Sequence, residues 1–128
     1  MKKIIIVVMI MILVSGCNSN NNEVDNTTNS INSITTKEVN TIVKEEKDYI
    51  IIDVRTKEEY ESGHIKGAIN IPVDDINSID IDKTKKIIVY CKSGKRSNNA
   101  ANILLNKGYK YIYDMGGINN WQYEVVGE

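Results

Sequence analysis

The chain has 128 residues, of which 41% are hydrophobic and 26% charged, and this length suits one small globular domain rather than two. Its formal net charge is -1 and its basic residues are spread along the sequence, so nucleic acid is a poor candidate partner. Any cationic binding site must therefore be built locally.

The first residues follow the order of a bacterial export signal. Lys2 and Lys3 precede eleven apolar residues, 4–14, which are too few for a membrane span of about 20 residues. The next residues, 14–17, read VSGC and resemble the lipobox of bacterial lipoproteins. That resemblance implies a signal peptide over 1–16 and a lipidated Cys17, with a plain secretory signal as the alternative. We expect an extracytoplasmic domain that is anchored to the cell membrane by this lipid.

A polar segment follows the cysteine. Twelve of the sixteen residues 18–33 are Asn, Ser or Thr, and hardly any is apolar. Such a segment buries too little apolar surface to offset the entropy of ordering it. We expect a flexible tether over 17–33 and the folded domain over 34–128.

From residue 34 onward, β-branched apolar runs alternate with amphipathic stretches, and this alternation predicts an α/β fold with a parallel sheet and helices on both faces. Thr35 or Thr36 is suited to cap the first helix, Ser97 to cap the last, and Gly108 to follow its end. We expect strands at 49–54, 68–72, 85–90 and 109–114, and helices at 35–46, 57–62, 73–79 and 97–108.

Cys91 lies between an expected strand and an expected helix, where open parallel sheets bind their ligands. A thiolate is favoured there by the helix N-terminus and by the cations Lys92, Lys95 and Arg96. Gly94 allows the loop to turn so that successive amides point at the sulfur. A lone cysteine is more often a small buried apolar residue, but this setting predicts a nucleophile beside an anion site.

Three motifs resemble those of the rhodanese-like sulfurtransferases. The loop YCKSGKRS at 90–97 is similar to the family's active-site loop. The segment IDVRTKEEYESGHIKGAINIP at 52–72 resembles its upstream signature, and MGGINNW at 115–121 resembles its closing motif. The resemblance covers 34–122 and implies a rhodanese-like fold with a central parallel β-sheet of about five strands.

The resemblance also implies sulfur transfer through a persulfide on Cys91. An anionic donor such as thiosulfate supplies the sulfur, and a thiol or cyanide accepts it, without a metal or organic cofactor. Arg96, with Lys92 and Lys95, is expected to hold the anionic end of the donor, and the loop amides to hold its terminal sulfur. We expect a monomer whose donor-binding residues are Lys92, Ser93, Gly94, Lys95, Arg96 and Ser97.

Four upstream residues are expected to support the site. Asp53 ends a buried strand and in the family helps to position the active loop, with general acid chemistry as the alternative. Arg55 and Glu59 are spaced to form an ion pair over a short helix. His64 could serve as a base for Cys91, but the family resemblance favours a structural, hydrogen-bonded histidine.

Three other functions are alternatives to sulfur transfer. An inactive rhodanese-like module would only bind a partner, although such modules typically lose the cysteine or the cationic loop that this chain keeps. Related phosphatases and arsenate reductases have five residues between cysteine and arginine, whereas four separate Cys91 from Arg96. A disulfide oxidoreductase is disfavoured because no second cysteine lies near Cys91 in the sequence, and Cys17 is expected to carry a lipid at the far end of the tether.

Overall fold

The computed structural model of the chain describes residues 29–127. The expected signal peptide, Cys17 and the first part of the expected tether lie outside these residues. In chain order, the elements are β1 (Ile31–Ser33), α1 (Thr36–Lys44), β2 (Ile50–Asp53), α2 (Lys57–Ser62), β3 (Ile69–Asn70), the 3-10 helix η1 (Val73–Ser78), β4 (Lys86–Cys91), α3 (Lys95–Asn106), β5 (Tyr111–Gly117) and the 3-10 helix η2 (Ile118–Asn120).

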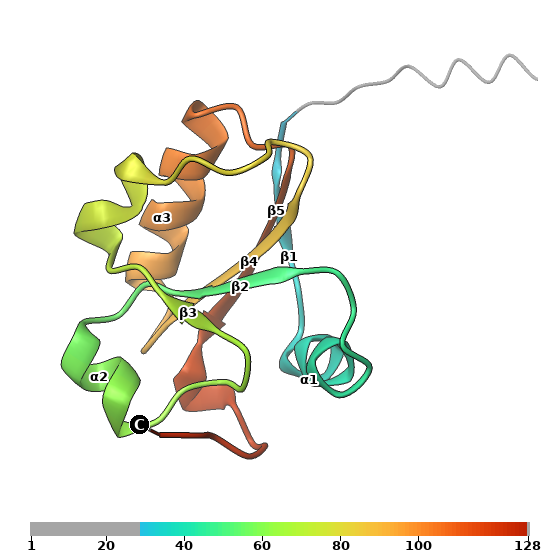
Figure 1. Cartoon of the computed structure of the whole chain (residues 1–128), viewed down its shortest axis with the longest axis vertical. Coiled ribbons are helices and arrows are strands. Elements are labelled where there is room, and N and C mark those ends of the chain that lie inside the picture. The colour runs from blue at the N-terminus through green and yellow to red at the C-terminus, as the bar shows by residue number, and fades with distance from the viewer. Residues whose placement is uncertain (1–28, 128) are drawn as a thin grey trace, which may run out of the picture.

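The five strands form one parallel sheet in the order β1-β5-β4-β2-β3 (Figure 1). In register, Ile52 of β2 lies beside Val89 of β4. The last residue of β4, Cys91, lies beside Gly117 at the end of β5. The expected α/β class with a five-stranded parallel sheet is thus confirmed. Because all strands run the same way, the loops after β2, β4 and β5 emerge at one end of the sheet.

Helices cover both faces of the sheet, as expected. Side chains of β4 alternate between two buried clusters: Ile87, Val89 and Cys91 pack on the face covered by α3 and η1. Ile88 and Tyr90 pack on the face covered by α1. A strand that is buried on both faces has to be apolar throughout, which explains the continuous apolar run.

The structured domain begins earlier than the sequence indicated. Residues 31–33, expected to belong to the tether, form β1 and pair with β5, with Ile31 beside Ile112. Ile31 also packs against the cluster under α3. This contact gives the short strand an apolar anchor in an otherwise polar segment, so the boundary at residue 34 was placed too late.

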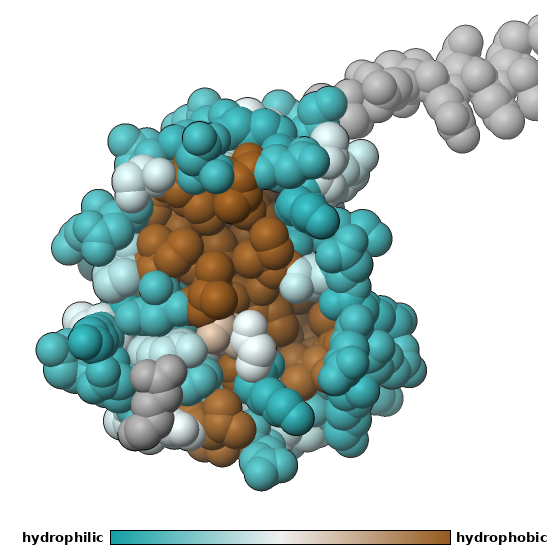
Figure 2. Space-filling view, in the orientation of Figure 1, coloured by the Kyte–Doolittle hydropathy of each residue, from teal (hydrophilic) through white to brown (hydrophobic). Residues whose placement is uncertain are grey.

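At the other edge of the sheet, β3 covers only part of its neighbour. It pairs with Ile52 and Asp53 of β2, so that Ile50 and Ile51 have a strand neighbour on the β4 side alone among the described residues. Ile69 of β3 is 47% exposed. Figure 2 shows apolar side chains in the middle of the face of the molecule that is turned to the viewer in Figure 1. Between residues 29 and 127, no helix is long and apolar enough to cross a membrane.

Candidate active site

The loop between β4 and α3 folds around the sulfur of Cys91. The Gly94 N–H donates to this sulfur at 3.0 Å, and Gly94 adopts a left-handed φ of 106°. Gly94, and not Ser97 as expected, is the N-cap of α3, because only a glycine takes this conformation without strain. Ser97 lies inside the first turn, where its hydroxyl donates to the Gly94 carbonyl at 3.1 Å.

The environment of Cys91 favours the thiolate. The side chain is buried, and burial by itself raises the pKa of the thiol. The nearby amide and hydroxyl of Ser97 and the amides of Gly94 and Ser93 outweigh this effect, and the pKa falls below its ordinary value of 9.0. The sequence-based expectation of a loop that stabilises an anionic sulfur agrees with this geometry.

The glycine pair at the end of β5 supports the loop from the other side. A Cβ at Gly117 would lie 2.5 Å from the Lys92 carbonyl oxygen and 2.8 Å from the Ser93 Cα. The N–H of Asn119 donates to the same Lys92 oxygen at 3.1 Å. The backbone of the closing motif therefore lies directly against the active loop and leaves no space for a side chain at Gly117.

A buried ion pair lies at the end of β2. Asp53 is fully buried and Arg55 is 6% exposed, and the Arg55 Nη2 lies 2.7 Å from the Asp53 Oδ2. The same nitrogen donates to the Gly63 carbonyl at 2.7 Å, while the Asn70 side chain donates to the carbonyls of both Asp53 and Arg55. These contacts tie the end of β2 to α2 and β3, and the expected role of Asp53 in positioning the active loop stays a prediction.

The expected pair of Arg55 with Glu59 is wrong. Glu59 binds Arg96 through both terminal nitrogens, at 2.6 Å and 3.0 Å. The spacing of four residues favours a pair only inside a helix, and Arg55 precedes the N-cap of α2, Thr56. The hydrogen bond from Arg96 is the main cause that lowers the pKa of Glu59 from 4.5 to about 2.

His64 has the contacts of a structural histidine. It is buried, its Nδ1 lies 2.8 Å from the Tyr60 carbonyl oxygen, and its ring stacks on the Tyr60 ring at 3.7 Å. Its backbone pairs with that of Val126 in the C-terminal segment. No hydrogen bond joins His64 to Cys91 within the part of the chain that the structure describes. The expectation of a structural role agrees with these contacts.

The remaining loop residues lie at the surface. Lys92, Ser93 and Lys95 are exposed, whereas Arg96 is half-buried against Glu59. The structure thus brings Cys91 together with the loop residues from Lys92 to Ser97, as expected, but it directs the arginine toward a carboxylate. The sequence predicted Glu59 as a supporting residue but paired it with Arg55 instead of Arg96. It predicted no contact between the active loop and the glycine pair Gly116 and Gly117.

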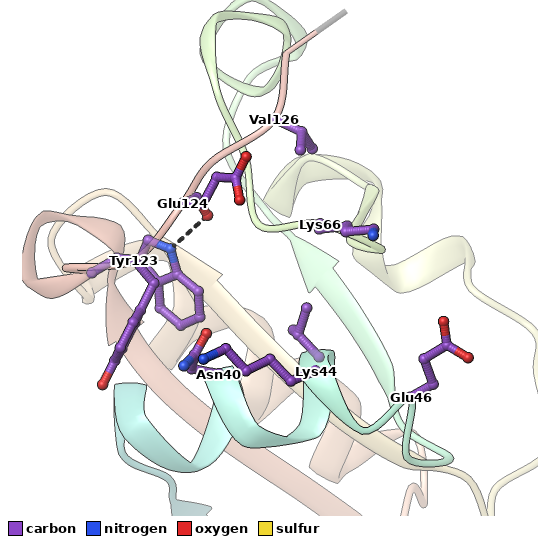
Figure 3. A pocket seen from close by; sticks show the side chains of 9 residues that line it. Asn40, Lys44, Glu46, Lys66, Tyr123, Glu124 and Val126 are labelled. Carbon is purple, nitrogen blue, oxygen red and sulfur yellow. Dashed lines mark hydrogen bonds between the residues drawn. The ribbon is translucent and has the colours of Figure 1, made fainter.

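A separate cleft of about 620 Å³ lies between α1 and the C-terminal segment (Figure 3). Figure 3 shows the side chains of Asn40 and Lys44 opposite Tyr123 and Glu124 across this cleft. None of its lining residues belongs to the loop 91–97. The cleft is therefore separate from the loop that holds Cys91.

The geometry of the loop and of the sheet agrees with a known family. Residues 35–124 match the family model described as rhodanese-like domain. The chain belongs to the rhodanese-like family. A crystal structure of a rhodanese-like domain protein from Staphylococcus aureus has a TM-score of 0.66 and 33% identity, and the match covers 76% of this chain and 98% of that one.

Two curated relatives show the range of activities around this domain. The chain is 37% identical over 73 residues to the thiosulfate sulfurtransferase PspE of Escherichia coli (strain K12), covering 54% of this chain and 70% of PspE. It is 36% identical over 88 residues to a tRNA uridine(34) hydroxylase of Hamiltonella defensa, covering 62% of this chain. The matched part spans only 24% of the length of that hydroxylase. A rhodanese-like enzyme is the level of function that these matches support.

Proposed function

We propose that this rhodanese-like domain is a sulfurtransferase that carries sulfur as a persulfide on Cys91. The observation that carries the proposal is the sulfur at the end of β4, which accepts the Gly94 amide at 3.0 Å and has a lowered pKa. A thiolate held by backbone amides is a nucleophile, and the same amides can hold the extra sulfur once it is attached. The similarity to PspE supports the same activity.

The transfer takes two displacement steps. The Cys91 thiolate attacks the outer sulfur of thiosulfate, the S–S bond of the donor breaks, and sulfite leaves with the bonding electron pair. Cys91 then carries a persulfide anion. The thiolate of an acceptor attacks the outer sulfur of this persulfide, the Cys91 S–S bond breaks, and the thiolate of Cys91 is restored. Neither step needs a metal or an organic cofactor.

The expected role of Arg96 changes in this proposal. Both terminal nitrogens of the Arg96 guanidinium donate to Glu59, so Arg96 anchors the loop to α2. The groups that face an incoming anion are then the loop amides and the exposed side chains of Lys92 and Lys95. Backbone amides hold an anion at fixed positions, while the two lysines attract it from solution.

A turnover assay tests the proposal and its alternatives. The full chain should form thiocyanate from thiosulfate and cyanide, and Cys91→Ser should abolish this activity. Hydrolysis of an aryl phosphate without thiocyanate formation would instead support a phosphatase. That alternative is disfavoured because the loop has one residue fewer between cysteine and arginine than the phosphatase loops, and because Arg96 already binds the carboxylate of Glu59. No turnover on a folded, reduced protein would favour a binding module.

We also propose that the domain acts outside the cytoplasm, as a monomer held at the membrane by a lipid on Cys17. The support is the sequence pattern alone: Lys2 and Lys3, the apolar run 4–14 and the lipobox-like residues before Cys17. The chain expressed in a bacterium should lose residues 1–16, carry a lipid on Cys17 and partition with membranes. Cys17→Ala should remove the lipid and the partitioning, and a soluble wild-type chain would contradict the anchor.

A further inference from the structure

The arginine of the active loop is neutralised by a carboxylate from another element. Arg96 belongs to the first turn of α3, Glu59 to α2, and the two side chains are 33% and 29% exposed. Two parallel hydrogen bonds, at 2.6 Å and 3.0 Å, join them. Fork-to-fork contacts of this kind are the strongest and most directional that an arginine makes with a carboxylate. The edge of the guanidinium that carries its two terminal nitrogens is therefore already occupied by a carboxylate.

Glu59 is held in this position by contacts that do not involve Arg96. Its carboxylate accepts from the N–H and the hydroxyl of Thr56, at 3.3 Å and 3.2 Å, and its own N–H donates to the Thr56 hydroxyl. This capping box fixes the first turn of α2. An anionic donor that recruited Arg96 would have to displace a carboxylate whose Oε1 is also held by Thr56.

The charges near the sulfur follow from this arrangement. The charges of Arg96 and Glu59 cancel, and the cations left on the loop are the exposed Lys92 and Lys95. The Cys91 thiolate is itself negative. Thiosulfate brings two negative charges to this site, whereas the reacting end of an organic persulfide brings one at most. By neutralising Arg96, Glu59 therefore weakens the electrostatic attraction of the site for thiosulfate more than for an organic persulfide.

We infer that Glu59 is a specificity-determining residue that directs the site toward organic persulfides and away from dianionic donors. This inference rests on the proposed sulfurtransferase function and names its preferred donor class. With such a donor, the Cys91 thiolate attacks the outer sulfur, the S–S bond of the donor breaks, and the organic thiolate leaves with the electron pair. The product on Cys91 is the same persulfide.

The test is Glu59→Gln, which removes the charge but retains the capping box, because glutamine serves at this position as glutamate does. The measurement is kcat/KM for transfer from thiosulfate and from the persulfide of 2-mercaptoethanol, with cyanide as the common acceptor. We expect thiosulfate transfer to rise about fivefold or more, and persulfide transfer to change less than about twofold. Added salt should reduce the gain with thiosulfate.

Two further variants make the test specific. Glu61→Gln removes the same charge from the same helix, where Glu61 pairs with Lys57 at 3.7 Å, and should leave both donors unchanged. Glu59→Gln combined with Arg96→Gln should lose the thiosulfate gain. Equal changes with both donors in Glu59→Gln would overturn the inference, since Glu59 would then only hold the loop in place. A wild-type chain that transfers sulfur from neither donor would instead overturn the proposed function.

Discussion

The carbonyl oxygen of Lys92 occupies the space that a side chain at Gly117 would need, at 2.5 Å from the position of its Cβ. Lys92 follows the reactive cysteine and Gly117 ends β5, so this approach joins the active loop to the neighbouring strand. The φ of Gly117 is -100°, which any residue can adopt. The glycine is therefore required by the lack of space and not by its backbone conformation.

Gly117→Ala should displace the active loop. The methyl group meets backbone atoms that cannot turn aside, so we expect a loss of about 1–3 kcal/mol in the free energy of unfolding. The rate of persulfide formation should fall by about tenfold or more, because reacting groups lose their alignment when the loop moves. Urea unfolding and single-turnover kinetics measure the two effects.

Gly127→Ala is the matched control for this substitution, since its Cβ would meet only the Glu61 carbonyl oxygen, at 3.3 Å, in an exposed segment. It should change stability by less than about 0.5 kcal/mol. If Gly117→Ala behaved like this control, the close approach to Lys92 would have no importance for the loop.

Asp53→Asn should destabilise the domain strongly. The substitution leaves the Arg55 guanidinium buried without a counter-charge, and breaking a buried pair in this way costs about 3–5 kcal/mol. The free energy of unfolding measures the loss. Asp48→Asn breaks the exposed contact with Lys85, at 3.8 Å, and should change the free energy by less than about 0.5 kcal/mol. A comparable, small change in Asp53→Asn would show that the buried pair does not support the fold.

Ser97→Ala should raise the pKa of Cys91. Burial already raises this pKa, and the Ser97 hydroxyl is one of the groups that lower it. The rate of alkylation by iodoacetamide, measured against pH, should show a midpoint below 9.0 in the wild type and a higher midpoint in the variant. Ser93→Ala leaves the loop amides in place and should not move the midpoint. Identical profiles for all three proteins would show that the Ser97 hydroxyl does not lower the pKa of Cys91.

The Glu59–Arg96 pair should make stability depend on pH in the acid range. The pKa of Glu59 falls from 4.5 to about 2 on folding. Because the folded-state pKa is the lower one, the stabilisation is complete above the unfolded value and disappears as the pH falls through the folded value. Near pH 7, we expect the wild type to exceed Glu59→Gln by about 1 kcal/mol at most, since the pair is partly exposed.

Urea unfolding of both proteins from neutral pH downward follows this difference. It should begin to shrink below the pH of 4.5 at which the unfolded carboxyl titrates, and it should vanish near pH 2. Glu61→Gln should show a smaller effect, because its partner Lys57 lies at 3.7 Å and the side chains are more exposed. A difference that stays constant down to pH 2 would contradict the charge-based stabilisation.

The sequence was informative where local rules decide the structure. The β-branched runs of β2 and β4 predicted buried strands. Thr35 or Thr36 was expected to cap the first helix, and the structure shows Thr35 in a capping box with Glu38. The cysteine between a strand and a helix indicated the site, because parallel sheets place ligands there.

Tertiary contacts decided what the sequence left open. Arg96 and Glu59 are 37 positions apart in the sequence. No local rule predicts that Glu59 pairs with Arg96 and not with Arg55. Likewise, β1 lies in a segment whose composition favours a tether, and only the apolar Ile31 hinted at a strand. Ser97 failed as a cap because a glycine that turns the loop starts the helix earlier. Each of these depends on neighbours supplied by the folded sheet.

The most direct test of sulfur transfer is the intact mass of the full chain carrying Cys17→Ser, which leaves Cys91 as its one thiol. After incubation with thiosulfate or with an organic persulfide, the account predicts a gain of one sulfur atom that cyanide reverses and that a further Cys91→Ser substitution abolishes. A folded, reduced protein whose mass stays unchanged with both donors would contradict it.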